Sequence, residues 1–172
     1  MTDTNFFAGS TYDLQNISRY LEKTDIPILR KEFILDSIQI QESYLMGANA
    51  ILLIISILKD KTKELFSYAK RLGLDVIVEV HNKEELDLAI KIGANIIGIN
   101  NRNLFTFEES INICLELSRE IPKGIIKIAE SAIKTEDNIK RIKKAGFDAV
   151  LIGETLVKSK KPADTIKQLI RA

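Results

Sequence analysis

Short apolar runs alternate with charged segments of helical periodicity along the whole chain. The apolar runs cover residues 28–34, 50–58, 76–81, 96–101, 125–131 and 149–154. Most of them are nearly continuous in hydrophobicity, a pattern typical of strands that are buried on both faces of a parallel sheet. The charged segments predict helices at residues 11–22, 37–46, 61–72, 83–92, 107–120, 135–145 and 164–171. The pattern therefore predicts an α/β protein built from repeated strand–helix units.

Glycines mark the joints of this repeat. Four of them follow a predicted helix and precede the next strand by a few residues, the position at which a left-handed C-terminal cap favours glycine. They are Gly47, Gly73, Gly93 and Gly146, in the similar local sequences MGANA, LGLDV, IGANI and AGFDA. Thr135 with Asn138 marks one helix start, and Pro162 marks the start of the last helix, where its missing N–H costs nothing.

Repeated βα units leave two architectures, an open doubly wound sheet or a (β/α)8 barrel. The chain contains neither a Gly-x-Gly-x-x-Gly turn nor a Gly-Lys-Ser phosphate loop, which an open nucleotide-binding sheet would favour. Polar residues instead follow nearly every apolar run, as they do at the C-terminal rim of a barrel. The prediction is a TIM (β/α)8-barrel fold, here incomplete, with about six parallel strands.

Composition excludes several classes of function. The 172 residues carry a net charge of +1 without a basic stripe, which argues against nucleic-acid binding. The single cysteine, Cys114, excludes an internal disulfide framework and a multi-cysteine metal site. The longest apolar run, residues 50–58, is too short to span a bilayer. With no signal peptide visible at the N-terminus, the protein is expected to be cytoplasmic, and neither a membrane partner nor a metal is predicted.

Charged and polar side chains gather at the predicted strand ends. They are Arg30, Lys31 and Glu32; Ser56; Glu79 and His81; Asn100, Asn101 and Arg102; Glu130 and Ser131; and Gly153 with Glu154. An unpaired charge is costly to bury, so such groups are paired or belong to a site. For Lys31 two interpretations stay open: a structural salt bridge with Glu79 or Glu130, or a general acid–base pair with one of them. For His81 a hydrogen bond to the following loop is favoured over catalysis.

The last two predicted strands carry a different pattern. Small and polar residues follow them, Ser131 to Ile133 after one and Gly153 to Leu156 after the other. Many barrels bind a phosphate at this place through backbone N–H groups and the N-terminus of a short extra helix. Residues 155–159 fit that extra helix, so a phosphorylated small molecule is the expected ligand.

The motifs together resemble indole-3-glycerol phosphate synthase, and their order matches across the whole chain. They are Asn5-Phe6-Phe7-Ala8-Gly9-Ser10, Pro27-Ile28-Leu29-Arg30-Lys31-Glu32-Phe33-Ile34, Glu79-Val80-His81, Gly98-Ile99-Asn100-Asn101-Arg102-Asn103-Leu104, Ala129-Glu130-Ser131-Ala132-Ile133 and Ile152-Gly153-Glu154. The resemblance implies a carbon–carbon carboxy-lyase of tryptophan biosynthesis that needs no cofactor. It would convert 1-(2-carboxyphenylamino)-1-deoxyribulose 5-phosphate into indole-3-glycerol phosphate with loss of CO2 and water.

The resemblance also implies roles for individual residues. Lys31 would be the general acid that protonates the ribulose carbonyl, and Glu79 the general base of the dehydration. Asn100 and Glu130 would orient the substrate, with Arg102 supporting them electrostatically. The remaining implied contacts are Phe33 and Leu104 along the anthranilate ring, and Ser131, Ala132, Gly153 and Glu154 around the phosphate.

Two departures from the family pattern stand out. The family has glycine where this chain has Ala132; if the position needs a positive φ, alanine strains it and weakens phosphate binding. The family also has a helical extension and two further strands, the first with a second catalytic lysine, before the point at which this chain starts. We therefore expect residues 1–172 to form a single partial barrel domain, a truncated one, with open edges at its first and last strands.

Two rival interpretations remain open. Another phosphate-binding barrel such as phosphoribosylanthranilate isomerase would need a cysteine and an aspartate as its acid–base pair, but Cys114 falls within a predicted helix. A catalytically impaired remnant would instead need a complementary N-terminal fragment, or would self-associate through its open edges. Activity of the chain on its own would distinguish the remnant from a working enzyme.

Overall fold

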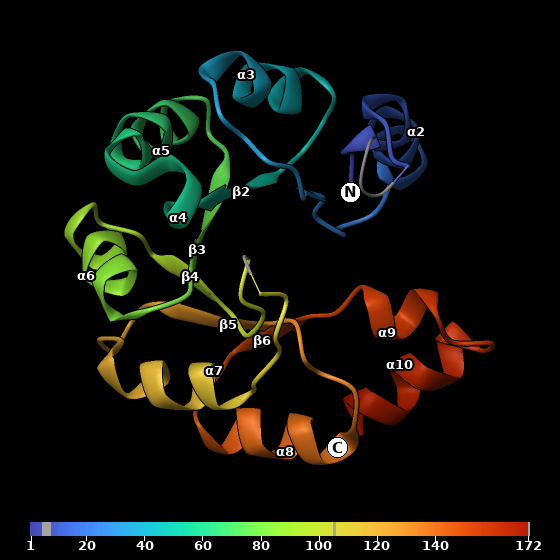
Figure 1. Ribbon diagram of the computed structural model, residues 1–172. Helices are drawn as coiled ribbons and strands as arrows, with labels where there is room; N and C mark the ends of the chain where they lie inside the picture. Colours follow the sequence, from blue (N-terminus) through green and yellow to red (C-terminus); the bar gives the residue numbers. More distant parts are fainter. Residues whose placement is uncertain (5–7, 105, 172) are drawn as a thin grey trace. The chain divides into compact units, whose positions relative to one another are not determined.

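The computed structural model describes residues 1–4, 8–104 and 106–171. Its contacts divide it into two compact units, Met1–Glu79 and Val80–Ala172, and each unit is described by itself (Figure 1). Asn5, Phe6 and Phe7, which open the first motif of the resemblance, lie outside the described residues. No helix within the described ranges is both long and apolar enough to cross a membrane.

The first unit alternates helices with parallel strands. Its elements are α2 (Thr11–Leu21), β1 (Leu29–Arg30), α3 (Ser37–Leu45), β2 (Ala50–Ile54), α4 (Ile55–Leu58), the 3-10 turn η1 (Lys59–Lys61), α5 (Thr62–Arg71) and β3 (Asp75–Val80), whose last residue belongs to the second unit. Strand β2 pairs in parallel with β1 on one side and with β3 on the other. The register places Ile54 opposite Glu79, so the polar end of β3 lies level with the end of β2.

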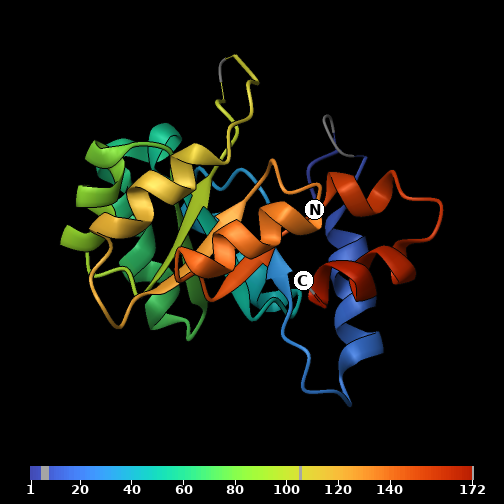
Figure 2. The same cartoon turned by 90° about the horizontal axis from the view of Figure 1, so that it is seen from below.

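The second unit repeats the same arrangement. Its elements are α6 (Lys83–Lys91), β4 (Ile96–Asn100), α7 (Asn112–Leu117), the 3-10 turn η2 (Ser118–Glu120), β5 (Ile126–Glu130), α8 (Glu136–Lys144), β6 (Ala149–Leu151), α9 (Glu154–Val157) and α10 (Pro162–Ile170). Strand β5 pairs in parallel with β4 and with β6. Helices α7 and α8 lie side by side on one face of these strands (Figures 1 and 2). The predicted α/β repeat with parallel strands is confirmed.

Continuous hydrophobicity corresponds to burial of both strand faces. Successive residues of β2, from Ile51 to Ile54, are all buried, as are those of β3 from Val76 to Val80. Strand β6 differs, because Ala149 and Val150 are exposed although both are apolar. In the part of the chain that the structure describes, β6 pairs with β5 alone.

The predicted helix boundaries arise from local hydrogen bonding. Thr135 and Asn138 form a reciprocal capping box at the start of α8, and Pro162 occupies the first turn of α10. Gly47 ends α3 with φ +85°, and a Cβ there would collide with the Ser18 hydroxyl. Glycine is therefore required at this joint for two reasons, the left-handed backbone and the close approach of α2.

Three boundaries differ from the sequence prediction. The run 28–34 keeps only two strand residues, because the Lys31 carbonyl turns to accept from Thr2 N and the Glu32 carbonyl accepts from Ile34 N. The run 50–58 ends as a strand at Ile54 and continues as α4. The helix predicted at 107–120 starts only at Asn112. Residues 102–104 and 106–110 are not helical, and Arg102 and Glu109 form an antiparallel bridge.

Candidate functional site

A lysine and a buried glutamate meet at the strand ends of the first unit. Glu79 is the penultimate residue of β3, and its side chain is 1% exposed. Lys31 follows β1 directly, and its Nζ lies 3.5 Å from Glu79 Oε2. The structure thus pairs these two residues as the sequence suggested. A proton donor with one end in solvent and an acceptor shielded from it can act on a molecule bound between them.

The residues flanking Lys31 have structural partners. The Arg30 guanidinium is buried, donates to Thr2 Oγ1 and Ser43 Oγ, and forms an ion pair with Glu42. Glu32 accepts from the Thr2 hydroxyl and from the Phe33 backbone N–H. These contacts fix the backbone on both sides of Lys31. Phe33 itself is half-buried.

Ser56 and His81 were also predicted at the strand ends. Ser56 lies in a helix instead, and His81 makes a local contact. Ser56 lies in the first turn of α4 rather than at the end of β2. The backbone N–H of His81 donates to Glu85 Oε2 at 2.8 Å, and its Nδ1 lies 3.1 Å from the same oxygen. This contact with the first turn of α6 agrees with the hydrogen-bonded interpretation of His81.

In the second unit, Asn100 and Glu130 end neighbouring strands at the same level. They are register partners of β4 and β5, and their side chains are buried. The Asn100 side-chain oxygen accepts from the backbone N–H of Arg102 at 3.0 Å. This bond helps to direct the chain after β4 into the loop that carries Arg102 and Leu104, of which Leu104 is half-buried.

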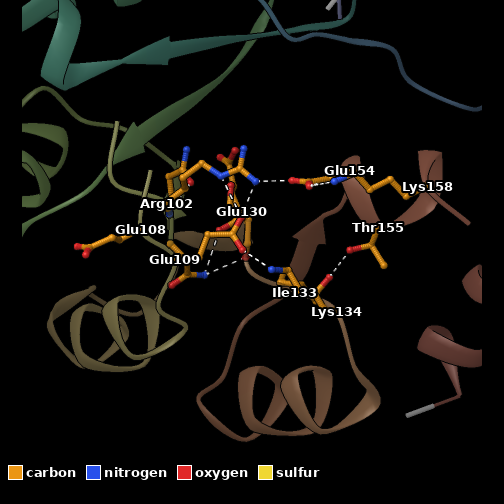
Figure 3. Close-up of polar contacts among 12 residues, drawn as sticks. Arg102, Glu108, Glu109, Glu130, Ile133, Lys134, Glu154, Thr155 and Lys158 are labelled. Carbon is orange, nitrogen blue, oxygen red and sulfur yellow. Dashed lines mark hydrogen bonds and ion pairs between the residues drawn. The ribbon is translucent and has the colours of Figure 1, made fainter. Parts of the chain in front are cut away.

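An ion-pair network joins the three loops that follow β4, β5 and β6 (Figure 3). Arg102 donates through Nε and Nη2 to Glu109 Oε1, and through Nη2 to Glu154 Oε2. Lys134 pairs with the other oxygen of Glu109, and Lys158 with the other oxygen of Glu154.

The ion-pair network shifts the pKa values of Arg102, Glu109, Lys134 and Glu154. The pKa of Glu154 is lowered to about 2, mainly by the hydrogen bond from Lys158 and next by the hydrogen bond from Arg102. Lys134 first, and then Arg102, lowers the pKa of Glu109, while Glu109 raises the pKa of Lys134. Hydrogen bonds to Glu109 and then Glu154 raise the pKa of Arg102. Arg102, Glu109, Lys134 and Glu154 are therefore charged at neutral pH.

The loop after β5 has an unusual backbone. Ser131 and Ala132 both have positive φ, 61° and 58°, although neither is glycine. The left-handed region costs an L-residue roughly 1–2 kcal/mol. Ala132 thus has the positive φ that would explain why the family has glycine at this position. The segment after β6 is joined to the loop after β5, because Thr155 Oγ1 donates to the Ile133 carbonyl at 2.9 Å. Gly153 directly precedes α9.

Four residues with roles in these contacts received no site role of their own from the sequence, although Asn101 and Thr155 lie within the strand-end motifs. Glu109 and Lys134 belong to the ion-pair network, Thr155 links two loops, and Asn101 is buried with both side-chain atoms bonded. The signal for Asn101 was its place in the Asn100-Asn101-Arg102 motif. Nothing local marked Glu109, because its partners lie elsewhere in the sequence.

Cys114 lies in α7, away from any strand end. It is fully buried, its Sγ lies 3.1 Å from the Ile111 carbonyl oxygen, and burial raises the pKa of its thiol. A buried thiol with a raised pKa is a poor nucleophile at neutral pH. Among the described residues, no group of three or more His, Cys, Asp or Glu could hold a metal ion.

Comparisons with known proteins agree on one family. The family model described as indole-3-glycerol phosphate synthase matches residues 1–169. The indole-3-glycerol phosphate synthase of Thermoanaerobacter sp. (strain X514) is 42% identical over 99% of this chain, and that of Endomicrobium trichonymphae is 46% identical over 98%. The chain spans 65% of the length of both relatives.

A solved structure independently supports the fold. The 3-hexulose-6-phosphate synthase from Salmonella typhimurium, a TIM-barrel-type enzyme, superposes with a TM-score of 0.81 at 15% identity. The match covers 99% of this chain and 83% of that one. At this identity the likeness concerns the fold alone, and it confirms the predicted barrel-family architecture.

Proposed function

The chain belongs to the indole-3-glycerol phosphate synthase family, and from this premise we propose that it carries the larger part of a synthase active site. The proposed reaction closes the pyrrole ring of 1-(2-carboxyphenylamino)-1-deoxyribulose 5-phosphate. A carbon–carbon bond forms at the ribulose carbonyl, and CO2 and one water leave to give indole-3-glycerol phosphate. The enzyme class would be a carbon–carbon carboxy-lyase without a cofactor.

The Lys31–Glu79 pair is the observation that carries this proposal. Lys31 Nζ lies 3.5 Å from a carboxylate that is shielded from water. In the proposed reaction Lys31 donates a proton to the ribulose carbonyl oxygen as the ring closes. Glu79 then takes the proton that must leave when the hydroxyl departs as water. Exclusion of water around Glu79 strengthens each of these electrostatic contacts.

The second unit would orient the substrate. Asn100 and Glu130 end adjacent strands in register and would contact the substrate hydroxyls. Arg102, held by two carboxylates, would complement the negative charge of the substrate. Phe33 and Leu104, which are both half-buried, would line the anthranilate ring.

The loops after β5 and β6 would bind the phosphate. Ser131, Ala132 and Gly153 would do so through backbone N–H groups, which suit an anion at a turn of positive φ and at the start of α9. The carboxylate of Glu154 is occupied by Arg102 and Lys158. Its backbone rather than its side chain would therefore face the phosphate.

The isomerase alternative is not supported. It requires a reactive cysteine at a strand end, whereas Cys114 is buried within α7. The family match and the Lys31–Glu79 pair both favour the synthase chemistry.

We further propose that residues 1–172 act as one partial barrel domain in the cytoplasm and associate with a complementary strand segment. The support is the exposed apolar surface of β6 at Ala149 and Val150, which a further parallel strand would cover. The part of the relatives' length that this chain does not match is the natural source of such a segment.

The test is an activity assay with and without that segment. The chain is assayed alone, and then after refolding with the unmatched part of the Thermoanaerobacter relative, by the fluorescence of indole-3-glycerol phosphate. We expect activity in the combined preparation and its loss in Lys31→Ala. Absence of product in the combined, folded preparation would contradict the synthase proposal, and full activity of the chain alone would contradict the need for a partner.

A further inference from the structure

Asn101 connects the end of β4 to the strained turn after β5. It is 0% exposed. Its side-chain Nδ2 donates to the Glu130 carbonyl at 3.0 Å and to the Ser131 carbonyl at 3.4 Å, and its backbone N–H donates to the same Glu130 carbonyl at 2.8 Å. Three hydrogen bonds from one residue therefore converge on two successive peptide groups.

The orientation of this side chain is fixed by its partners. On the other side, the side-chain oxygen of Asn101 accepts from the backbone N–H of Cys114 at 3.0 Å. An amide N–H can only donate and a carbonyl can only accept, so the opposite orientation of the side chain would place like groups together. A buried asparagine with all these partners is costly to disturb.

The bonded carbonyls flank residues whose backbone is unfavourable. Ser131 and Ala132 occupy the left-handed region without the freedom of glycine. Such a conformation persists only where the surroundings impose it. Asn101 holds the two carbonyls that enter this turn, through its side chain and its backbone N–H.

We propose that Asn101 is a positioning residue for anion binding: it holds the Glu130–Ala132 backbone in the turn that presents N–H groups to the substrate phosphate. The proposal rests on the phosphate role assigned to this loop under the proposed function. Asn101 acts through the backbone of Glu130 and Ser131, and it has no contact with the reacting atoms. Its hydrogen bonds hold the positive φ of the turn, which alanine at position 132 adopts less readily than glycine would.

A double-mutant cycle in the 172-residue chain tests this role. Asn101→Asp keeps the shape and the acceptor for Cys114 N but removes the donors that face the carbonyls. Ala132→Gly removes the strain that those donors oppose. Cys114→Ala is the matched control, because it perturbs the same buried region while leaving the Asn101 side chain in place. The readouts are amide hydrogen exchange at residues 131–133 and the Kd of inorganic phosphate.

We expect Asn101→Asp to raise exchange at residues 131–133 and the phosphate Kd roughly tenfold, equivalent to about 1.4 kcal/mol, beyond the effect of Cys114→Ala. When Ala132→Gly is combined with Asn101→Asp, it should recover roughly threefold or more of each loss, which exceeds its gain in the wild-type chain. If Asn101→Asp does not fold, Asn101→Ser, which is too short to reach both carbonyls, takes its place.

Strictly additive effects, or equal opening of the loop in Cys114→Ala, would show a general structural role and overturn the proposal. A failure of the phosphate assignment has a different signature. The coupled change in exchange would then appear while wild-type chain binds no phosphate, so that Asn101 restrains the turn but the turn is not an anion site.

Discussion

Lys31 Nζ and Glu79 Oε2 lie 3.5 Å apart, with the lysine partly in solvent and the glutamate 1% exposed. The pair is thus asymmetric in its access to water. Lys31→Met, which keeps most of the length of the side chain, should lower turnover in the reconstituted preparation by about 100- to 10,000-fold if lysine transfers a proton. Steady-state kinetics by product fluorescence measures this loss.

Stability provides a check on this pair that does not need activity. The same Lys31→Met change removes a cation beside a buried carboxylate and should cost about 1–2 kcal/mol in urea unfolding. Adding Glu79→Gln should return part of that stability, because the buried group is then neutral. Lys23→Met, at an exposed lysine, is the control and should change neither property. Equal effects of the two lysine variants would contradict the role of the pair.

The positive φ of Ala132 predicts a stabilising substitution. Relief of left-handed strain is worth roughly 1–2 kcal/mol, and the extra unfolded-state freedom of glycine offsets about 0.4–1 kcal/mol of it. Ala132→Gly should therefore raise the free energy of unfolding by about 0–1.6 kcal/mol, measured by urea denaturation. Ala145→Gly, at a residue with φ −78°, lacks this relief and should lower it. A loss of stability in both variants would show that the turn carries no such strain.

Glu154 should titrate far below an ordinary glutamate. Its pKa is lowered from 4.5 to about 2, first by Lys158 and then by Arg102. A carboxyl whose folded pKa lies below its unfolded value contributes stability above about pH 4.5, and this contribution disappears as the pH falls towards 2. Carboxyl ¹³C NMR should give a midpoint near 2 in wild-type protein. In Lys158→Met, and in high salt, the midpoint should move upward, and an unmoved midpoint would refute the assigned cause.

The repeat was predictable because its signals are local. A continuous apolar run, or a glycine such as Gly47 after a helix, can be recognised from the few residues around it. The runs in β2 and β3 form buried strands, and Gly47 ends α3 with a positive φ, as expected. Strand-end residues followed from the same logic, since parallel strands end on one side of a sheet. This placed Asn100 and Glu130 level on neighbouring strands.

Contacts between distant residues were not predictable in this way. The helix expected from 107 begins at Asn112 because Glu109 pairs with Arg102 and Lys134. The expected strand at 28–34 is short because the N-terminal Thr2 binds the Lys31 carbonyl. In each case a partner remote in sequence outweighs the local pattern, and only the fold shows which partner it is.

Gly47 and Gly73 separate two costs of a side chain at a helix end. Both have positive φ, +85° and +81°, but a Cβ would meet Ser18 at Gly47 and no atom within 4 Å at Gly73. Gly73→Ala should cost about 1 kcal/mol from backbone strain alone. Gly47→Ala should cost at least about 1 kcal/mol more, because α2 must move. Urea unfolding of the two variants measures the difference, and equal losses would show that Ser18 yields without cost.

Glu109 should control the order of the chain at residues 102–104 and 106–111. Its side chain is 16% exposed and joins Arg102 to Lys134, so Glu109→Gln removes two ion pairs while keeping the shape. We expect a loss of about 0.5–1.5 kcal/mol and faster amide exchange at Asn103 and Ser110. Glu108→Gln is the matched control, because this exposed neighbour accepts a hydrogen bond from the Thr106 hydroxyl and lies outside the ion-pair network. Because the Glu109 carboxylate is mostly buried and carries two ion pairs whereas the Glu108 side chain is exposed, the two variants should differ clearly. If they lose the same stability, the ion-pair network does not order this loop.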